Sequence, residues 1–141
     1  MKLMRYNHNS EPTSLARLGV MVEGEMVGDL RAAYARCLVE KGDTQGRQVA
    51  ALRMPPHLVS YLQIGPAARD AVAEAKDFLD NLASDSSTTG LDGESLLIPL
   101  SEARLHATCK PTKVIAVGRN YSEHLKEAGL DLDHKVPSAW I

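Results

Sequence analysis

The chain has 141 residues, a formal net charge of -2, and 44% hydrophobic and 24% charged residues. This length suits one domain, or one small domain with part of another, and the ordinary globular composition excludes a disordered chain, collagen and a coiled coil. The 16 basic residues form no cluster, so we expect no nucleic-acid partner. The N-terminus lacks the apolar stretch of a signal peptide, and no apolar run reaches the roughly 18 residues of a membrane span, so we expect a cytoplasmic protein without membrane contact.

The two cysteines, Cys37 and Cys109, are too few for a disulfide framework and form no CxxC pair. We expect both to be buried thiols. His106 precedes Cys109 at HxxC spacing, but two potential ligands do not make a metal site, so a structural role is expected. The sequence identifies no partner for His8 or His57, and we assign them no function.

Hydrophobic periodicity predicts strands followed by a helix at the start of the chain. Strands are expected over residues 2–6 and 18–22, the second because apolar residues recur at every other position. Gly24 between two glutamates predicts a hairpin turn. Asp29 is placed to cap a helix over residues 30–41, and Gly42 follows that helix as a C-terminal residue with positive φ.

Two more helices are predicted after a polar loop at residues 42–47. The first is short, follows Pro55-Pro56 and ends at Gly65. The second is the clearest helix of the chain and begins at Pro66, a residue favoured in the first helical turn. Its apolar stripe has the spacing of one helix face: Ala68, Ala71, Val72, Ala75, Phe78, Leu79 and Leu82.

Residues 84–95 contain one apolar residue, Leu91, among serines, threonines, aspartates and glycines. This is the composition of a solvated linker. We therefore predict an N-terminal α+β domain over residues 1–83, a linker over 84–95, and the beginning of a second domain over 96–141.

The second domain is short for independent folding. Its helix is expected to start at Asn120, an N-cap residue, and to end at Gly129. After the linker come the stretches at residues 96–100 and 105–108, and the apolar runs at 114–117 and 136–141 predict strands. The strand at 114–117 has the length and β-branching of a buried strand. The last strand has no remaining sequence to pair with, so we expect the chain to be truncated or to dock on another chain.

His124 and Glu127 are three residues apart on this predicted helix and therefore share a face. A carboxylate there can orient the imidazole and support its protonated form, which is the arrangement of a general-base dyad. On spacing alone, a histidine and a glutamate so placed on an exposed helix are more often a solvated surface pair. Arg119, at the turn before the helix, could hold a substrate carboxylate in its planar fork or form a surface ion pair. The loop that follows holds three further potential cation ligands that are ordinarily solvated: Asp131, Asp133 and His134.

The run KVIAVGRNYSEHLKEAG, from Lys113 to Gly129, closely resembles the start of the catalytic domain in the fumarylacetoacetate hydrolase family. Its GRNYxxHxxE pattern is fairly specific. A looser likeness connects residues 1–6, 18–30 and 54–56 with the small N-terminal domain of longer bacterial members. Residues 136–141 resemble the strand after the family's mobile loop.

This resemblance implies a metal-dependent hydrolase, decarboxylase, isomerase or lyase that acts on small 2-oxo or 2,4-dioxo acids in catabolism. It implies a β-rich roll, a homodimer, and Mg²⁺ (or Mn²⁺ or Ca²⁺) whose ligands, including an ExE motif, lie after the equivalent of Ile141. It also implies that His124 and Glu127 form the catalytic dyad, and we expect Arg119 and Tyr121 to bind substrate. An extra metal-binding Asp of the eponymous hydrolase has no match near Val117, so the acylpyruvate and oxaloacetate group fits better.

Two hypotheses follow for the chain. In the first it is the N-terminal part of such an enzyme, inactive by itself because the metal ligands are elsewhere. In the second it is a non-catalytic module that associates with other chains through its unfinished sheet. The substrate is not identified by either, because few of the residues that would select it are present.

Overall fold

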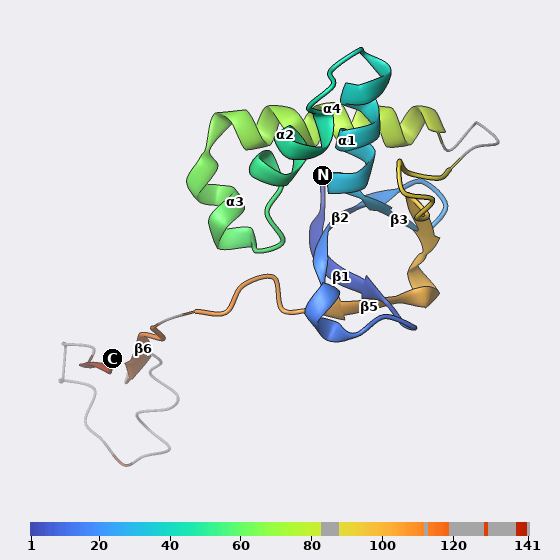
Figure 1. The fold of residues 1–141 in the computed structure, drawn as a ribbon. Coiled ribbons are helices and arrows are strands. Elements are labelled where there is room, and N and C mark those ends of the chain that lie inside the picture. The colour runs from blue at the N-terminus through green and yellow to red at the C-terminus, as the bar shows by residue number, and fades with distance from the viewer. Residues whose placement is uncertain (83–87, 112, 119–128, 130–137, 141) are drawn as a thin grey trace. The chain divides into compact units, whose positions relative to one another are not determined.

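A computed structural model describes residues 1–82, 88–111, 113–118, 129 and 138–140 of the chain (Figure 1). The chain divides into two compact units, Met1–Cys109 and Lys110–Ile141. The first unit combines an antiparallel sheet with four helices, so the expected α+β class is confirmed. None of the described helices is long and apolar enough to cross a membrane.

The sheet of the first unit has five strands in the order β4-β3-β2-β1-β5 and curls into a half-barrel (Figure 1). Every neighbouring pair is antiparallel. Two short 3-10 helices connect strands: η1 (Thr13–Leu15) joins β1 to β2, and η2 (Leu100–Glu102) joins β4 to β5. The strands are β1 (Leu3–His8), β2 (Arg17–Val22), β3 (Met26–Asp29), β4 (Leu97–Pro99) and β5 (Ala103–His106).

The β2–β3 hairpin forms where the sequence predicts it. Val22 pairs with Met26, and the turn between them has Gly24 at φ 75° and Glu25 at φ 57°. Positive φ is easy for glycine and costly for other residues. Further along the hairpin Gly19 pairs with Asp29, and this pairing brings Asp29 beside the start of β2.

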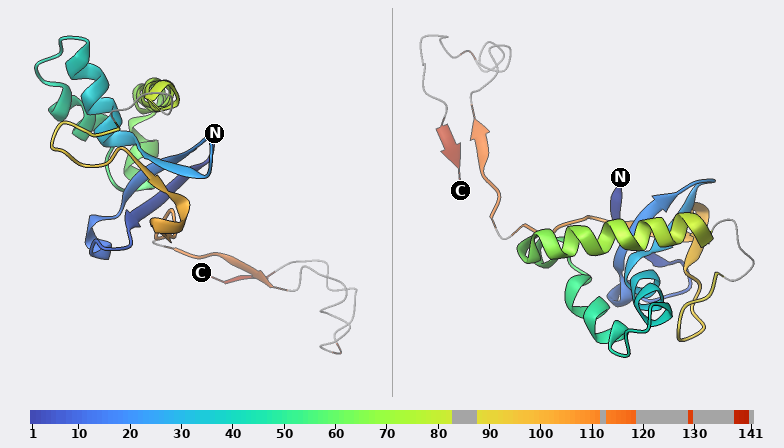
Figure 2. Two further views of the ribbon diagram at one scale, coloured as in Figure 1. Left: turned by 90° about the vertical axis from the view of Figure 1, so that its right-hand side faces the viewer. Right: turned by 90° about the horizontal axis from the view of Figure 1, so that it is seen from above.

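Four helices separate β3 from β4 in the chain and cover one face of the sheet (Figures 1 and 2). Both α1 and α4 contact β2, and they also contact each other. The helices are α1 (Leu30–Glu40), α2 (Gly46–Arg53), α3 (Leu58–Ile64) and α4 (Pro66–Leu82). The predicted stripe of α4 is buried, with Phe78 partly so. Val20, Leu30, Val72 and Leu79 are all at 0% exposure in the resulting core.

Residues on the opposite face of the sheet form a second, smaller cluster. Tyr6, Val27 and Ile98 are buried there, with Met4 and Met21 packed against them. They alternate along their strands with residues of the larger core, as the period of two in a strand requires. The sheet is therefore buried on both faces over part of its area.

Residues 88–95 do not form the predicted linker. The amide of Leu96 donates to the carbonyl of Thr88 at 2.8 Å, and that of Gly90 to the carbonyl of Glu94 at 2.7 Å. A β-bridge joins Thr89 to Ser95. These polar residues thus make a folded turn whose backbone groups bond to one another, and polar composition alone does not distinguish such a turn from a linker.

The observed division of the chain also differs from the predicted one. β4 pairs with β3 through Val27 and Ile98, and β5 pairs with β1 through Tyr6 and Leu105. Both strands therefore belong to the first unit, although they follow the predicted boundary at residue 95. Strand pairing joins residues far apart in sequence, so local composition does not reveal it.

In the second unit, β6 (Ala116–Gly118) and β7 (Ser138–Trp140) form a two-stranded antiparallel sheet. The prediction that the last strand has no partner is wrong, since Val117 pairs with Ala139. The prediction of a buried strand over 114–117 needs correction too, because Val114 and Ile115 precede β6 and are 69% and 64% exposed. The helix predicted from residue 120 lies outside the described residues, apart from Gly129.

Candidate functional site

All four residues assigned to catalysis or substrate binding, Arg119, Tyr121, His124 and Glu127, lie outside the described residues. The same holds for the three potential cation ligands of the following loop: Asp131, Asp133 and His134. The structure describes the two strands, β6 and β7, that precede and follow residues 119–137. Gly118 at the end of β6 pairs with Ser138 at the start of β7, so the two ends of the segment lie next to each other.

His106 of the HxxC pair makes a structural contact. The Nε2 atom of His106 hydrogen-bonds to Oδ1 of Asn7, a residue at 0% exposure, so the histidine joins β5 to β1 as a structural contact. Cys109 is exposed, which corrects the expectation that both thiols are buried, whereas Cys37 is buried. Burial raises the pKa of the Cys37 thiol, although the nearby Lys41 opposes the change. Within the described ranges no three His, Cys, Asp or Glu residues come together to hold a metal ion.

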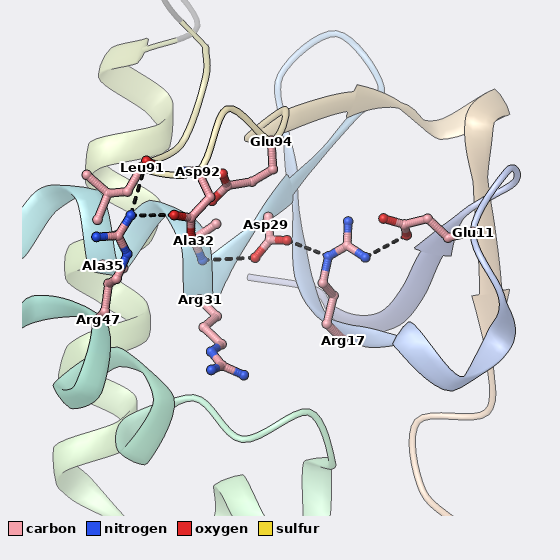
Figure 3. Close-up of a pocket in the computed structure, with 10 residues that line it drawn as sticks. All are labelled: Glu11, Arg17, Asp29, Arg31, Ala32, Ala35, Arg47, Leu91, Asp92 and Glu94. Atoms are coloured by element: carbon pink, nitrogen blue, oxygen red, sulfur yellow. Dashed lines mark hydrogen bonds and ion pairs between the residues drawn. The ribbon is translucent and has the colours of Figure 1, made fainter.

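A pocket of about 340 Å³ lies at the first turn of α1 and is the candidate site of the first unit (Figure 3). Its lining comes from the β1–β2 connection, the start of β2, the end of β3, α1, α2 and the turn at residues 88–95. Charged residues dominate this lining: Glu11, Arg17, Asp29, Arg31, Arg47, Asp92 and Glu94.

Arg17 is held by two carboxylates. Its Nε donates to Oδ2 of Asp29 at 2.5 Å, and one terminal nitrogen donates to Oε2 of Glu11 at 2.7 Å. Its guanidinium carbon also lies 5.1 Å from the ring centre of Tyr6, at cation–π distance. Burial by itself lowers the pKa of Arg17, but the hydrogen bond that Arg17 donates to Glu11 and the charge of Asp29 outweigh burial and raise it. Arg17 is thus a charged structural residue whose guanidinium is already bonded to Glu11 and Asp29.

The two carboxylates have structural duties of their own. Asp29 is 3% exposed, and its Oδ1 accepts a hydrogen bond at 3.0 Å from the amide of Ala32, so it caps α1 as predicted. Glu11 also accepts from the amide of His8 at 2.9 Å. Burial alone raises the pKa of Glu11, yet the hydrogen bonds from Arg17 and His8 outweigh it and lower that pKa. Because Arg17 neutralises both carboxylates, this side of the pocket supports the fold.

The other two arginines of the pocket differ from each other. Arg47 donates to Oδ1 of Asp92 at 2.5 Å and to the carbonyl of Leu91 at 3.1 Å. Arg31 is exposed and forms no hydrogen bond or ion pair with another described residue, and Figure 3 shows its guanidinium pointing away from Arg17. Arg31 is therefore the one arginine of this pocket that has no partner among the described residues.

His8, to which sequence analysis gave no role, connects two parts of the sheet. Its Nδ1 lies 2.6 Å from Oγ of Ser10 and accepts from the Ser10 amide at 3.1 Å, while Nε2 lies 3.3 Å from Oε2 of Glu102. A serine, a histidine and a glutamate in contact resemble a hydrolytic triad. Here, however, Nδ1 is already bonded to the backbone of the same short turn. The contact is a structural connection between β1 and η2.

Sequence reasoning missed the Arg17–Asp29 pair. The two residues are brought together by the pairing of Gly19 with Asp29, and a charged residue at each end of a predicted hairpin was the one available signal. Comparison with known proteins adds no further site: no family model matches this chain, and no curated protein sequence matches it.

Proposed function

We propose that this chain forms the first part of an enzyme of the fumarylacetoacetate hydrolase type, acting on small 2-oxo or 2,4-dioxo acids. The observation that carries the proposal is the GRNYxxHxxE pattern, which begins at Gly118, the last residue of β6. The pattern combines a guanidinium, a phenol, an imidazole and a carboxylate in one short segment. The β-rich roll of that family is part of the same proposal for the second unit.

Each residue of the pattern has a proposed role. His124 takes a proton from the attacking water, and Glu127, three residues later on a helix, orients the imidazole and stabilises its charged form. The water oxygen then adds to the substrate carbonyl carbon, the adjacent C–C bond breaks with its electron pair on the departing carbon, and His124 returns its proton to that carbon. Arg119 holds the substrate carboxylate in a bidentate contact, and the hydroxyl of Tyr121 donates a hydrogen bond to it.

A divalent metal in such enzymes polarises the substrate oxygens as a Lewis acid. The part of this chain that the structure describes brings no three potential ligands together. The family resemblance places the metal ligands after the equivalent of Ile141, so no metal-binding role is proposed for the residues named above, and their roles concern proton transfer and substrate contacts.

The test is a steady-state assay of the protein at its full encoded length, with Mg²⁺, against an acylpyruvate and oxaloacetate. We expect turnover by the wild type and a loss of about 10²- to 10⁴-fold in kcat for His124→Ala. His57→Ala is the matched control, since His57 is an exposed histidine before α3 without a capping hydrogen bond, and it should leave kcat unchanged. Absence of turnover on every such acid, or equal rates for both variants, would refute the proposal.

A second proposal is an interaction module, and the exposure of Val114 and Ile115 beside β6 favours it. A two-stranded sheet is marginally stable by itself, so β6 and β7 would gain from packing against another chain. Light scattering of the purified chain tests this idea. A dimer that becomes monomeric in the double variant Val114→Ser/Ile115→Ser supports it, and a monomer at high concentration contradicts it.

A further inference from the structure

A second cavity of the first unit, of about 320 Å³, lies between η1, α1 and the connection from α2 to α3. It shares Arg17 and Arg31 with the pocket of Figure 3 but has a different lining. Leu15, Met54 and Pro56 supply apolar surface, and none of the described lining residues is acidic. Small-molecule sites enclose about 300 to 1,000 Å³ and combine an apolar lining with a few polar groups, so this cavity is of the size and kind that holds a small ligand.

We propose that this cavity binds a small carboxylate with an apolar body. The carboxylate contacts the guanidinium of Arg31, and the hydrocarbon part lies against Leu15, Met54 and Pro56. Nothing in this proposal depends on the catalytic function proposed for the second unit.

The distribution of charge is the first argument. Arg17 already bonds to Glu11 and Asp29, and these carboxylates line the first pocket and not the second. Arg31 has no ion pair with another described residue and reaches both cavities. A planar guanidinium without a partner matches a carboxylate through two parallel hydrogen bonds. In the second cavity no described acidic side chain competes for that place.

The position of Arg31 in its helix is the second argument. Arg31 is the second residue of α1, at the end where helix dipoles give a partial positive charge. A cation is unfavourable there unless an anion accompanies it, and Asp29, the N-cap residue of this helix, is committed to the Ala32 amide and to Arg17. A bound carboxylate near Arg31 would gain from the arginine and from the helix end together.

The apolar lining is the third argument, because it favours binding of carboxylates that carry a hydrocarbon body over binding of inorganic anions. Leu15 is 55% exposed although it is a large hydrophobic residue, and Met54 beside it is 2% exposed. A ligand that covers Leu15 removes that apolar surface from water. Phosphate has no hydrocarbon part and acetate has only a methyl group with which to do so, and an alkylammonium ion would be repelled by the arginines.

Titration of the ¹⁵N-labelled 141-residue chain with hexanoate tests the proposal by NMR. We expect saturable shifts of the Leu15, Arg31 and Met54 amides, with weaker binding of acetate and phosphate and none of hexylammonium. Arg31→Gln should weaken hexanoate binding roughly tenfold or more, the usual effect of losing a charged hydrogen bond. Leu15→Ser should weaken it as well. Arg104→Gln, which removes an exposed arginine on β5, is the control and should change nothing.

Unchanged hexanoate affinity in Arg31→Gln would overturn the proposal, as would shifts that never saturate. Phosphate binding as tight as hexanoate binding would also overturn it, because the site would then select charge without an apolar body. Arg31 is exposed, so its substitution should leave the rest of the spectrum intact and the comparison interpretable.

Discussion

Replacement of Asp29 should separate its two roles, because alanine and asparagine remove different interactions. Asp29→Ala loses both the cap on the Ala32 amide and the ion pair with Arg17. Asp29→Asn keeps an oxygen that can cap α1, since asparagine is as good an N-cap residue as aspartate, but it loses the negative charge. The difference between the two variants therefore measures the cap.

The structure sets the size of each effect. Loss of an N-cap to alanine costs about 1 kcal/mol. Loss of a hydrogen bond between charged groups costs about 1.5 to 3 kcal/mol, and breaking a fully buried pair costs about 3 to 5. The lower range applies here, because the Asp29 side chain is 5% exposed but that of Arg17 is 23% exposed and keeps Glu11 as a partner. We expect destabilisation by about 3 kcal/mol for Asp29→Ala and about 2 kcal/mol for Asp29→Asn.

Urea unfolding followed by circular dichroism measures these free energies. Asp80→Ala is the control, because Asp80 forms an exposed pair with Lys76 on α4 and such pairs contribute less than about 0.5 kcal/mol. If Asp29→Ala and Asp29→Asn destabilise the protein equally, the cap has no energetic role. If both resemble the control, the reasoning about the ion pair is refuted as well.

Three further predictions concern other groups. Ellman's reagent should label Cys109 quickly and Cys37 slowly, because the Cys37 thiol is buried and its pKa is raised. Cys109→Ser should remove the fast phase of labelling. A fast phase that persists in this variant contradicts the assigned exposures. Because its pKa is lowered, Glu11 binds fewer protons in the folded state than in the unfolded state, so the free energy of unfolding should fall as the pH drops below about 4.5. The fall should be less steep in Glu11→Gln. Urea unfolding between pH 7 and pH 3 measures both curves. Under the proposed function, Glu127→Gln should lower kcat less than His124→Ala, and the double variant should be little worse than His124→Ala, whereas additive losses would show independent roles.

Several elements of the fold follow from short stretches of sequence. The helix after Asp29 begins where its cap predicts and ends one residue before the expected position. Gly42 and Gly65 have φ values of 92° and 76°, as expected of residues after helix ends. These features depend on neighbours within one or two turns, so local sequence is sufficient to predict them. For α2 the signal is weak, since Gly46 and Ala50 are its buried residues, and this helix was missed.

Pairing between distant segments could be decided only by the tertiary structure. The run around Ile98 has the pattern of a strand, but its local sequence does not show which strand it pairs with. It pairs with Val27, which precedes it in the chain by four helices, and not with a later strand. The predicted dyad of His124 and Glu127 comes from a motif within one segment and remains a prediction. The cavity beside Arg31, in contrast, exists because η1, α1 and the α2–α3 connection meet in the folded chain. None of the residues that these segments supply belongs to a recognisable sequence motif. Local patterns determine helices, turns and motifs through short-range sterics and hydrogen bonds. Sheet order and cavities depend instead on which apolar faces pack together in the folded chain.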